Sequence, residues 1–243
     1  MLSVTGLTAQ IGKVPVLRGV SLTVNSHDTV ALLGRNGVGK TSSLRAILGL
    51  LRRTGGSIVY EGQEITHLPA HKLASLGIGY VPQGRGVFPL LTVEENLLLG
   101  VRGAPDANIL DEVFTRFPRL KERLRQPAGT LSGGEQQMLA IGRCLLMKPR
   151  LIMLDEPTEG IMPKLVAQIR NEIADIAKRG ISVLLVEQNL RTALRLANRI
   201  YFMERGKVVH EGSTESIRSQ PETIHRYLGV SLKSSQEPAP NDQ

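Results

Sequence analysis

The sequence lacks tryptophan and has few other aromatic residues, with four phenylalanines, four tyrosines and a single cysteine among 243 residues. Its core must therefore be built mainly from leucine, isoleucine, valine and alanine. A single cysteine, Cys144, excludes an internal disulfide, and we expect a packed small hydrophobe in a reducing compartment. No apolar run approaches the roughly 18 residues that span a bilayer. Because Met1–Thr5 shows no basic segment before an apolar one, we also expect no signal peptide.

The formal net charge is +8, which suits nucleic acid, an acidic membrane surface or simply a solvated face. The basic residues are scattered, with small groups at Arg52–Arg53 and Arg116–Arg125. No zinc-finger spacing, basic zipper or aromatic-basic RNA motif accompanies them. We therefore expect no nucleic-acid partner.

One stretch, Gly34–Thr41, reads G-R-N-G-V-G-K-T and fits the phosphate-binding loop pattern G-x-x-x-x-G-K-[ST] at every fixed position. The apolar run Val30–Leu33 precedes it, and Ser42–Leu50 follows with helical spacing of apolar residues. Glycines let the backbone N–H groups turn toward an anion, and the following helix adds its positive dipole end. Lys40 supplies a cation for the outer phosphates, and Thr41 supplies a hydroxyl for Mg²⁺. The flanking strand and helix argue against a chance glycine turn.

Apolar runs that alternate with helical patterns predict an α/β protein with a largely parallel sheet. Strands are expected at 14–24, 30–33, 58–60, 78–81, 151–154, 182–186, 200–203 and 208–211. Helices are expected at 42–50, 71–76, 93–99, 106–117, from 131–134 to about 147, at 163–178 and 190–197, with short helices ending near 229. Gly55–Ser57 is predicted to be a loop and Glu204–Lys207 a hairpin turn.

A helical insert interrupts the strand-helix series between residues 92 and 124. It opens with a capping box, in which Glu95 stands three residues after Thr92. We expect a helical subdomain at about 84–148 within one domain that covers 1–230. The segment 231–243 is polar and contains proline, so a disordered tail is predicted.

A second strand, Leu151–Leu154, is wholly apolar and ends in the carboxylates of Asp155 and Glu156. A parallel strand buried on both faces must be apolar, and its carboxyl end opens on the ligand crevice. Asp155 is then placed to hold Mg²⁺, directly or through water. Glu156 is placed to polarise a water in line with the terminal phosphate. The alternative interpretation, a solvated acidic pair, is disfavoured because a phosphate loop lies upstream in the sequence.

The stretch Leu131–Gln137 reads L-S-G-G-E-Q-Q and predicts a second anion site at the start of a helix. Ser132 caps the helix with Glu135 as its third-residue partner, and Gly133–Gly134 is expected to leave backbone N–H groups accessible. Two anion sites in one chain either bind two phosphates or each contribute half of a shared nucleotide pocket.

With these motifs in place, the sequence resembles the ATP-binding cassette (ABC) ATPases from about residue 2 to residue 229. The phosphate loop, Gln83, Leu131–Gln137 and the acidic strand come in that family's order. The resemblance implies a P-loop NTPase ABC ATPase fold, with a RecA-like core, an antiparallel β subdomain and a helical subdomain. It also implies ATP and Mg²⁺ as ligands of a head-to-tail dimer. ATP would lie between one chain's phosphate loop and the other chain's Ser132–Gly134.

The resemblance assigns roles to individual residues. Catalysis is implied for Glu156, Gln83 and Gln188, and Mg²⁺ binding for Thr41, Gln83 and Asp155. Nucleotide contacts are implied for Gly34, Arg35, Asn36, Gly37, Val38, Gly39, Lys40, Thr41, Ser42, Ile11, Ser132, Gly133, Gly134 and Glu135.

Several stretches look like the ATPases of branched-chain amino acid and urea or short-chain amide uptake systems, namely 32–41, 81–85, 92–97, 135–143, 156–161 and 185–189. The urea-type members look slightly closer around the phosphate loop and 88–100. Such importers pair two different ATPases with two permeases and a solute-binding protein. The resemblance implies that this chain is one ATPase of a hetero- or homodimer, cytoplasmic and peripheral at the inner face of the membrane. The helical insert would carry the permease-docking surface.

Three positions depart from the general ABC pattern. Gln188 stands where the switch histidine is usual, and glutamine cannot carry positive charge or shuttle a proton. Met162 stands in place of an aspartate, which removes a polar contact across the dimer. Ile11 stands in place of the aromatic that stacks on adenine and lacks a π face. The first two changes predict weaker ATP hydrolysis, and the third predicts weaker selectivity for the nucleotide base.

Two alternatives stay open. A lipopolysaccharide-export ATPase has a similar length and a similar Tyr-Leu-Gly ending, but is expected to carry histidine at position 188. A non-transport ABC-type ATPase of DNA repair, iron–sulfur assembly or translation is expected to show long coiled-coil inserts or tandem cassettes, which this sequence lacks. Surface or capping roles, in turns or near helix ends, are expected for the five histidines: His27, His67, His71, His210 and His225.

Overall fold

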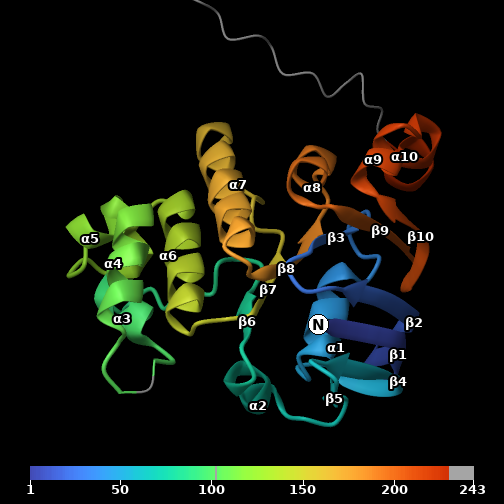
Figure 1. Cartoon of the computed structure of the whole chain (residues 1–243), viewed down its shortest axis with the longest axis horizontal. Coiled ribbons are helices and arrows are strands. Elements are labelled where there is room, and N and C mark those ends of the chain that lie inside the picture. Colours follow the sequence, from blue (N-terminus) through green and yellow to red (C-terminus); the bar gives the residue numbers. More distant parts are fainter. Residues whose placement is uncertain (102, 230–243) are drawn as a thin grey trace, which may run out of the picture.

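The computed structural model describes residues 1–101 and 103–229, and its strands form two sheets (Figure 1). The smaller sheet is antiparallel and has the order β2-β1-β4-β5. Its strands are β1 (Leu2–Ile11), β2 (Val14–Val24), β4 (Arg52–Tyr60) and β5 (Gln63–Glu64). The predicted tail, 231–243, lies outside the described residues.

The larger sheet has the order β10-β9-β3-β8-β7-β6 and is parallel except at its β10 edge. Its strands are β3 (Thr29–Leu33), β6 (Ile78–Val81), β7 (Leu151–Asp155), β8 (Ser182–Glu187), β9 (Arg199–Glu204) and β10 (Lys207–Ser213). Because β3, β8 and β7 are neighbours, the chain segments that follow them meet at one edge of the sheet.

The helices connect these strands and cover the sheets (Figure 1). They are α1 (Lys40–Ile47), α2 (Ala70–Ser75), α3 (Val93–Leu98), α4 (Ala107–Arg116), α5 (Pro118–Glu122), a 3₁₀ turn (Ala128–Thr130), α6 (Gly133–Leu146), α7 (Pro163–Lys178), α8 (Leu190–Leu196), α9 (Thr214–Arg218) and α10 (Pro221–Leu228). Among the described residues, no helix has the length and apolar character needed to cross a membrane.

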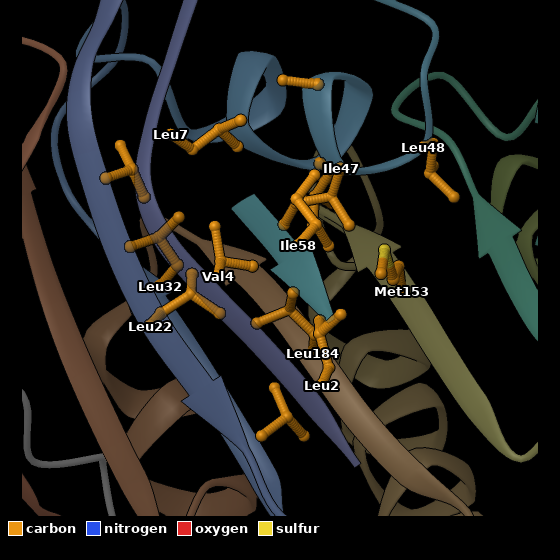
Figure 2. Close-up of a cluster of buried hydrophobic side chains, with 14 of the residues drawn as sticks. Leu2, Val4, Leu7, Leu22, Leu32, Ile47, Leu48, Ile58, Met153 and Leu184 are labelled. Atoms are coloured by element: carbon orange, nitrogen blue, oxygen red, sulfur yellow. The ribbon is translucent and has the colours of Figure 1, made fainter. Parts of the chain in front are cut away.

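One apolar cluster lies between the two sheets and packs against α1 (Figure 2). It joins Leu2 and Val4 of β1 to Ile47 of α1, Met153 of β7 and Leu184 of β8. Burial of such side chains contributes roughly 1.5–3 kcal/mol each, so this cluster fixes α1 against both sheets. The phosphate loop that precedes α1 is thereby held at a defined place.

A second cluster joins the helical insert to the sheet. Leu97 of α3, Met138 of α6 and Phe117, which lies between α4 and α5, pack in the same cluster as Ile152 of β7 and Ile173 of α7. Helices α3 to α6 lie together on one side of α7 (Figure 1). The division of the chain into a domain at 1–230 and a subdomain at 84–148 stays a prediction.

The largest departure from the predicted elements concerns β1 and β4. Strand β1 was not predicted, because the register shifts near Gly6, at a φ of 58°, break the simple alternation of buried residues. The predicted loop Gly55–Ser57 is wrong, since this segment lies inside β4. A Cβ added at Gly56 would lie 2.6 Å from the carbonyl oxygen of Gly6, so glycine permits the close approach of the two strands.

Two smaller features also differ from expectation. His210, expected in a turn or near a helix end, lies on β10 and stacks on Tyr227 with ring centroids 5.9 Å apart. Helix α5 was not predicted as a separate element, although Pro118 at its first position favours a helix start.

Candidate functional site

The phosphate loop connects β3 to α1, as the strand and helix patterns predicted. Gly37 and Gly39 have φ values of 78° and 110°, a region that favours glycine. A Cβ at Gly34 would lie 2.6 Å from the carbonyl oxygen of Met203, so packing also requires glycine there. No side chain caps the start of α1, which leaves its first N–H groups available for an anion.

A cavity of about 710 Å³ opens beside this loop, within the size range of small-molecule sites. Ten of the predicted site residues line it: Ile11, Asn36, Gly37, Val38, Gly39, Lys40, Thr41, Ser42, Gln83 and Glu156. Ile11 lies at its edge with 55% of its surface exposed, beside Pro15 and Val16. Gly34, Arg35 and Asn36 line a neighbouring depression with Gln188.

Lys40 and Glu156 form a buried ion pair in this structure. The Lys40 ammonium lies 3.0 Å from the Glu156 carboxylate, and the two side chains are 4% and 5% exposed. The ammonium also donates to the carbonyl oxygen of Arg35 at 3.2 Å. Glu156 follows β7 at a φ of 48°, and its N–H donates to the carbonyl oxygen of Val186 on β8. The predicted phosphate cation and the predicted catalytic carboxylate therefore neutralise each other.

Asp155 lies beneath the loop and is 1% exposed. One carboxylate oxygen accepts a hydrogen bond from the Thr41 hydroxyl at 2.9 Å, and the other accepts from the Tyr80 hydroxyl at 3.3 Å. Burial raises the pKa of Asp155, although both hydrogen bonds oppose this change. Tyr80, on β6, was not predicted as a site residue. The only sequence signal for such a role was the position of Tyr80 on the strand that precedes Gln83.

Thr41 and Asp155 offer the hydroxyl and carboxylate oxygens that Mg²⁺ prefers. Within residues 1–101 and 103–229, no group of three or more His, Cys, Asp and Glu side chains is arranged to hold a metal. A Mg²⁺ ion at Thr41 and Asp155 would thus need the oxygens of a phosphate ligand to complete its coordination. The residues present fit such a shared ion.

Gln83 follows β6 and extends toward the two carboxylates beyond β7. Its amide nitrogen donates to Glu159 at 2.7 Å and to Glu156 at 3.5 Å. Gln83 therefore lies beside the predicted catalytic carboxylate, and Glu159 is its stronger partner. The sequence offered no assigned role for Glu159, an exposed residue three positions after Glu156.

Gln188 is exposed, whereas its neighbour Glu187 is buried and anchors the segment. The Glu187 carboxylate accepts from the Thr158 hydroxyl at 2.7 Å and from the N–H groups of Gln188 and Asn189 at 3.2 and 3.1 Å. Burial raises the pKa of Glu187 in spite of these donors. Glu187 thus ties the chain after β8 to the chain after β7, a role that sequence reasoning missed.

The second predicted anion site, at the start of α6, does not line the cavity of its own chain. Ser132 and Glu135 form the predicted capping box. Burial raises the pKa of Glu135, but hydrogen bonds from Ser132 outweigh it and lower the value. Gly134 is buried against Leu165, contrary to the expected accessible backbone, and a Cβ there would lie 2.4 Å from Leu165 Cδ1. Only Gly133 is partly accessible.

The family model described as "ABC transporter" matches residues 17–159, more than half of the chain. The chain belongs to the ABC transporter family. This membership confirms the resemblance and the predicted fold class, and it makes the chain an ATPase. Members of this family work as dimers with membrane permease components.

Relatives of known name share nearly the full length of this ABC ATPase. The high-affinity branched-chain amino acid transport ATP-binding protein BraG of Pseudomonas aeruginosa is 44% identical, over 94% of this chain and 100% of BraG. The lipopolysaccharide export system ATP-binding protein LptB of Haemophilus influenzae is 38% identical, over 90% of this chain and 92% of LptB.

A solved structure shares the fold of this ABC ATPase. An ATP-binding cassette of an ABC transporter, crystallised in its ADP conformation, aligns with a TM-score of 0.80 and 28% identity. The alignment covers 95% of this chain and 99% of that cassette. Met162, where the resemblance implies an aspartate, immediately precedes α7 and is 65% exposed, so it lies at the surface rather than in the core.

Proposed function

We propose that this ABC ATPase drives an uptake transporter for branched-chain amino acids or a related small amide such as urea. The observation that carries the proposal is the convergence of Lys40, Thr41, Gln83 and Glu156 on one cavity, with Asp155 beneath it. The amino acid class rests on the likeness to BraG. The urea class rests on sequence resemblance alone.

The roles follow from the positions of the side chains. Lys40 binds the outer phosphates once it leaves Glu156, and the loop N–H groups bind the others. Thr41, Asp155 and Gln83 would hold Mg²⁺, which when bound would neutralise phosphate charge. Glu156, no longer paired with Lys40, accepts a proton from the attacking water while Gln83 orients that water. Gln188 donates a hydrogen bond to the γ-phosphate.

The start of α6 serves the nucleotide of a second ATPase chain. Ser132, Gly133, Gly134 and Glu135 lie away from the cavity of their own chain, which supports a shared site between two chains. The partner is a second ABC ATPase, in a heterodimer or a homodimer. ATP binding closes the dimer, and hydrolysis with phosphate release reopens it.

The assembly includes two transmembrane permeases and, indirectly, a solute-binding protein. We place the ATPase in the cytoplasm at the inner face of the membrane. Its docking surface for a permease lies on the helical insert and the segment just before it, where Phe88 and Leu90 are 52% and 92% exposed. The dimer cycle then drives the permease between its inward-facing and outward-facing states.

Two variants test the ATPase assignment. Glu156→Gln should bind ATP but hydrolyse it slower by orders of magnitude, whereas Lys40→Ala should lose nucleotide binding. Undiminished turnover in the first variant would exclude Glu156 as the base. If permease and solute-binding-protein genes are found beside the gene, co-expression with them would then test the cargo, by ATP-dependent uptake of labelled leucine or urea into proteoliposomes.

Lipopolysaccharide export is the runner-up function, and the 38% identity to LptB is its support. The identity to BraG is higher, and glutamine rather than histidine stands at position 188. Both observations favour uptake. Non-transport roles gain no support, because the relatives described above are all transport ATPases.

A further inference from the structure

Tyr80 occupies a place that no motif assigns to it. It lies on β6 opposite Met153 of β7, so its side chain shares a face with Asp155, two residues further along β7. A tyrosine is long enough to reach this diagonal neighbour. Its hydroxyl donates to the Asp155 oxygen that Thr41 leaves free.

This hydrogen bond fixes the plane of the Asp155 carboxylate. The carboxylate is buried, and its two oxygens have one hydroxyl donor each, Thr41 on one side and Tyr80 on the other. Without the Tyr80 hydroxyl, one buried oxygen would lose its partner and the group could rotate away from Thr41. A cation bound to Thr41 and Asp155 needs both groups in fixed positions.

Tyr80 also lines a different space, here called the α2–α6 cavity. This cavity has a volume of about 230 Å³. It is lined by Leu48, Leu50, Ala70, Ala74, Ile78, Gly79, Tyr80, Leu99, Arg143, Cys144 and Met147. The same residue thus borders the α2–α6 cavity and hydrogen-bonds the carboxylate beneath the phosphate loop. A displacement of Tyr80 at the cavity would therefore move its hydroxyl relative to Asp155.

We propose that Tyr80 is a positioning residue that orients Asp155 for the divalent cation and makes cation binding sensitive to how the α2–α6 cavity is filled. This inference rests on the proposed magnesium–nucleotide site. It adds a residue outside the motifs and a direction of coupling, from the α2–α6 cavity to the carboxylate.

The test is the binding of a fluorescent, non-hydrolysable ATP analogue to the full chain, titrated with Mg²⁺ and repeated in EDTA. Tyr80→Phe removes one oxygen and keeps the ring. We expect its apparent Mg²⁺ affinity to fall about tenfold, a loss within the range for a hydrogen bond to a charged group, with analogue binding in EDTA unchanged. Tyr60→Phe is the matched control, because the buried Tyr60 hydroxyl lies beside Arg150 and not beside Asp155, and it should retain the wild-type Mg²⁺ affinity.

A double-mutant cycle tests the link to the α2–α6 cavity. Ala74→Leu, which adds bulk to the cavity, should change the Mg²⁺ affinity of the wild-type chain at least threefold and that of Tyr80→Phe much less. Ala74→Ser, which hardly changes the volume, should have no effect. Equal effects of Ala74→Leu in both backgrounds would refute the coupling. Ala74→Leu alone still decides the matter if Tyr80→Phe does not fold, since an unchanged Mg²⁺ affinity would also refute it.

The outcomes separate this inference from the proposed function. If analogue binding to the wild-type chain does not respond to Mg²⁺ at all, the proposed metal site itself is wrong. If the wild-type chain responds and Tyr80→Phe matches it, only the role of Tyr80 is wrong. A Tyr80→Phe chain that loses binding equally in Mg²⁺ and in EDTA would show a general structural effect, which also overturns the proposal.

Discussion

The buried pair of Lys40 and Glu156 allows one prediction that links stability to nucleotide binding. In Glu156→Gln the ammonium of Lys40 stays buried but loses its counter-charge. Removing one partner of a buried ion pair costs about 3–5 kcal/mol. Glutamine keeps an amide oxygen as an acceptor for Lys40, so we take roughly half of that cost, ~2 kcal/mol. For a chain of this size the melting temperature without nucleotide should fall by about 4–8 °C.

Nucleotide should reverse this loss. ATP phosphates provide Lys40 with a new counter-charge, and in the variant no carboxylate competes for it. Saturating nucleotide should therefore raise the melting temperature of Glu156→Gln by more than it raises that of the wild-type chain, and the affinity for nucleotide should increase. Differential scanning fluorimetry with and without a non-hydrolysable analogue measures both shifts.

Glu159→Gln is the matched control for this experiment. Glu159 also hydrogen-bonds Gln83 but is exposed, so its neutralisation should change the free energy of unfolding by less than about 0.5 kcal/mol. The reasoning fails if Glu156→Gln melts at the wild-type temperature without nucleotide. It fails equally if the deficit persists at saturating nucleotide, because the loss would then not arise from an unpaired Lys40.

Four further outcomes are expected. Lys40→Ala should weaken nucleotide binding at least about 30-fold, since a charge-assisted contact is worth ~2 kcal/mol or more, and unchanged affinity in calorimetry would contradict the assignment. Gln188→His should raise ATP turnover in the assembled transporter, and equal turnover would refute the switch argument. Asn96→Ala should lower the free energy of unfolding by about 2–4 kcal/mol in urea titrations, because the fully buried Asn96 amide bonds the backbone of residues 88, 91 and 92, whereas the exposed Asn108→Ala should not. Because burial raises the pKa of Glu187, the wild-type chain should lose stability relative to Glu187→Gln as pH rises above the ordinary value of 4.5, and parallel stability curves would disprove this.

The elements that the sequence predicted well carry their own local signals. Helix α7 begins and ends at the predicted residues, because Pro163 sets its start and an amphipathic pattern runs to Gly180. The capping box at Ser132 needs only residues three positions apart. Strand β4 was predicted only at its end, 58–60, and the part before it had no such signal. Its glycines look like a loop, and only the approach of β1 makes them part of a sheet.

In the site, too, the features with a local sequence signal were predicted and those that depend on distant residues were not. The phosphate loop was predicted because strand, glycines and helix are contiguous in the sequence. Glu187 contacts Thr158, 29 positions away, and Tyr80 contacts Asp155, 75 positions away. Both contacts depend on the order of β6, β7 and β8 in the sheet. A single sequence predicts that these strands exist, but their order arises from tertiary packing. Residues whose roles depend on that order were therefore missed.

In the structure the side chains proposed for catalysis pair with neighbouring groups of the site. Lys40 bonds Glu156, and Gln83 bonds Glu159, so neither the cation nor the amide is free. In the proposed mechanism, phosphates that bind Lys40 would displace Glu156, and the same displacement would release the carboxylate proposed as the base for water. The pairing predicts that substitutions at Glu156 and Lys40 have non-additive effects on nucleotide binding, because the two residues are ion-pair partners.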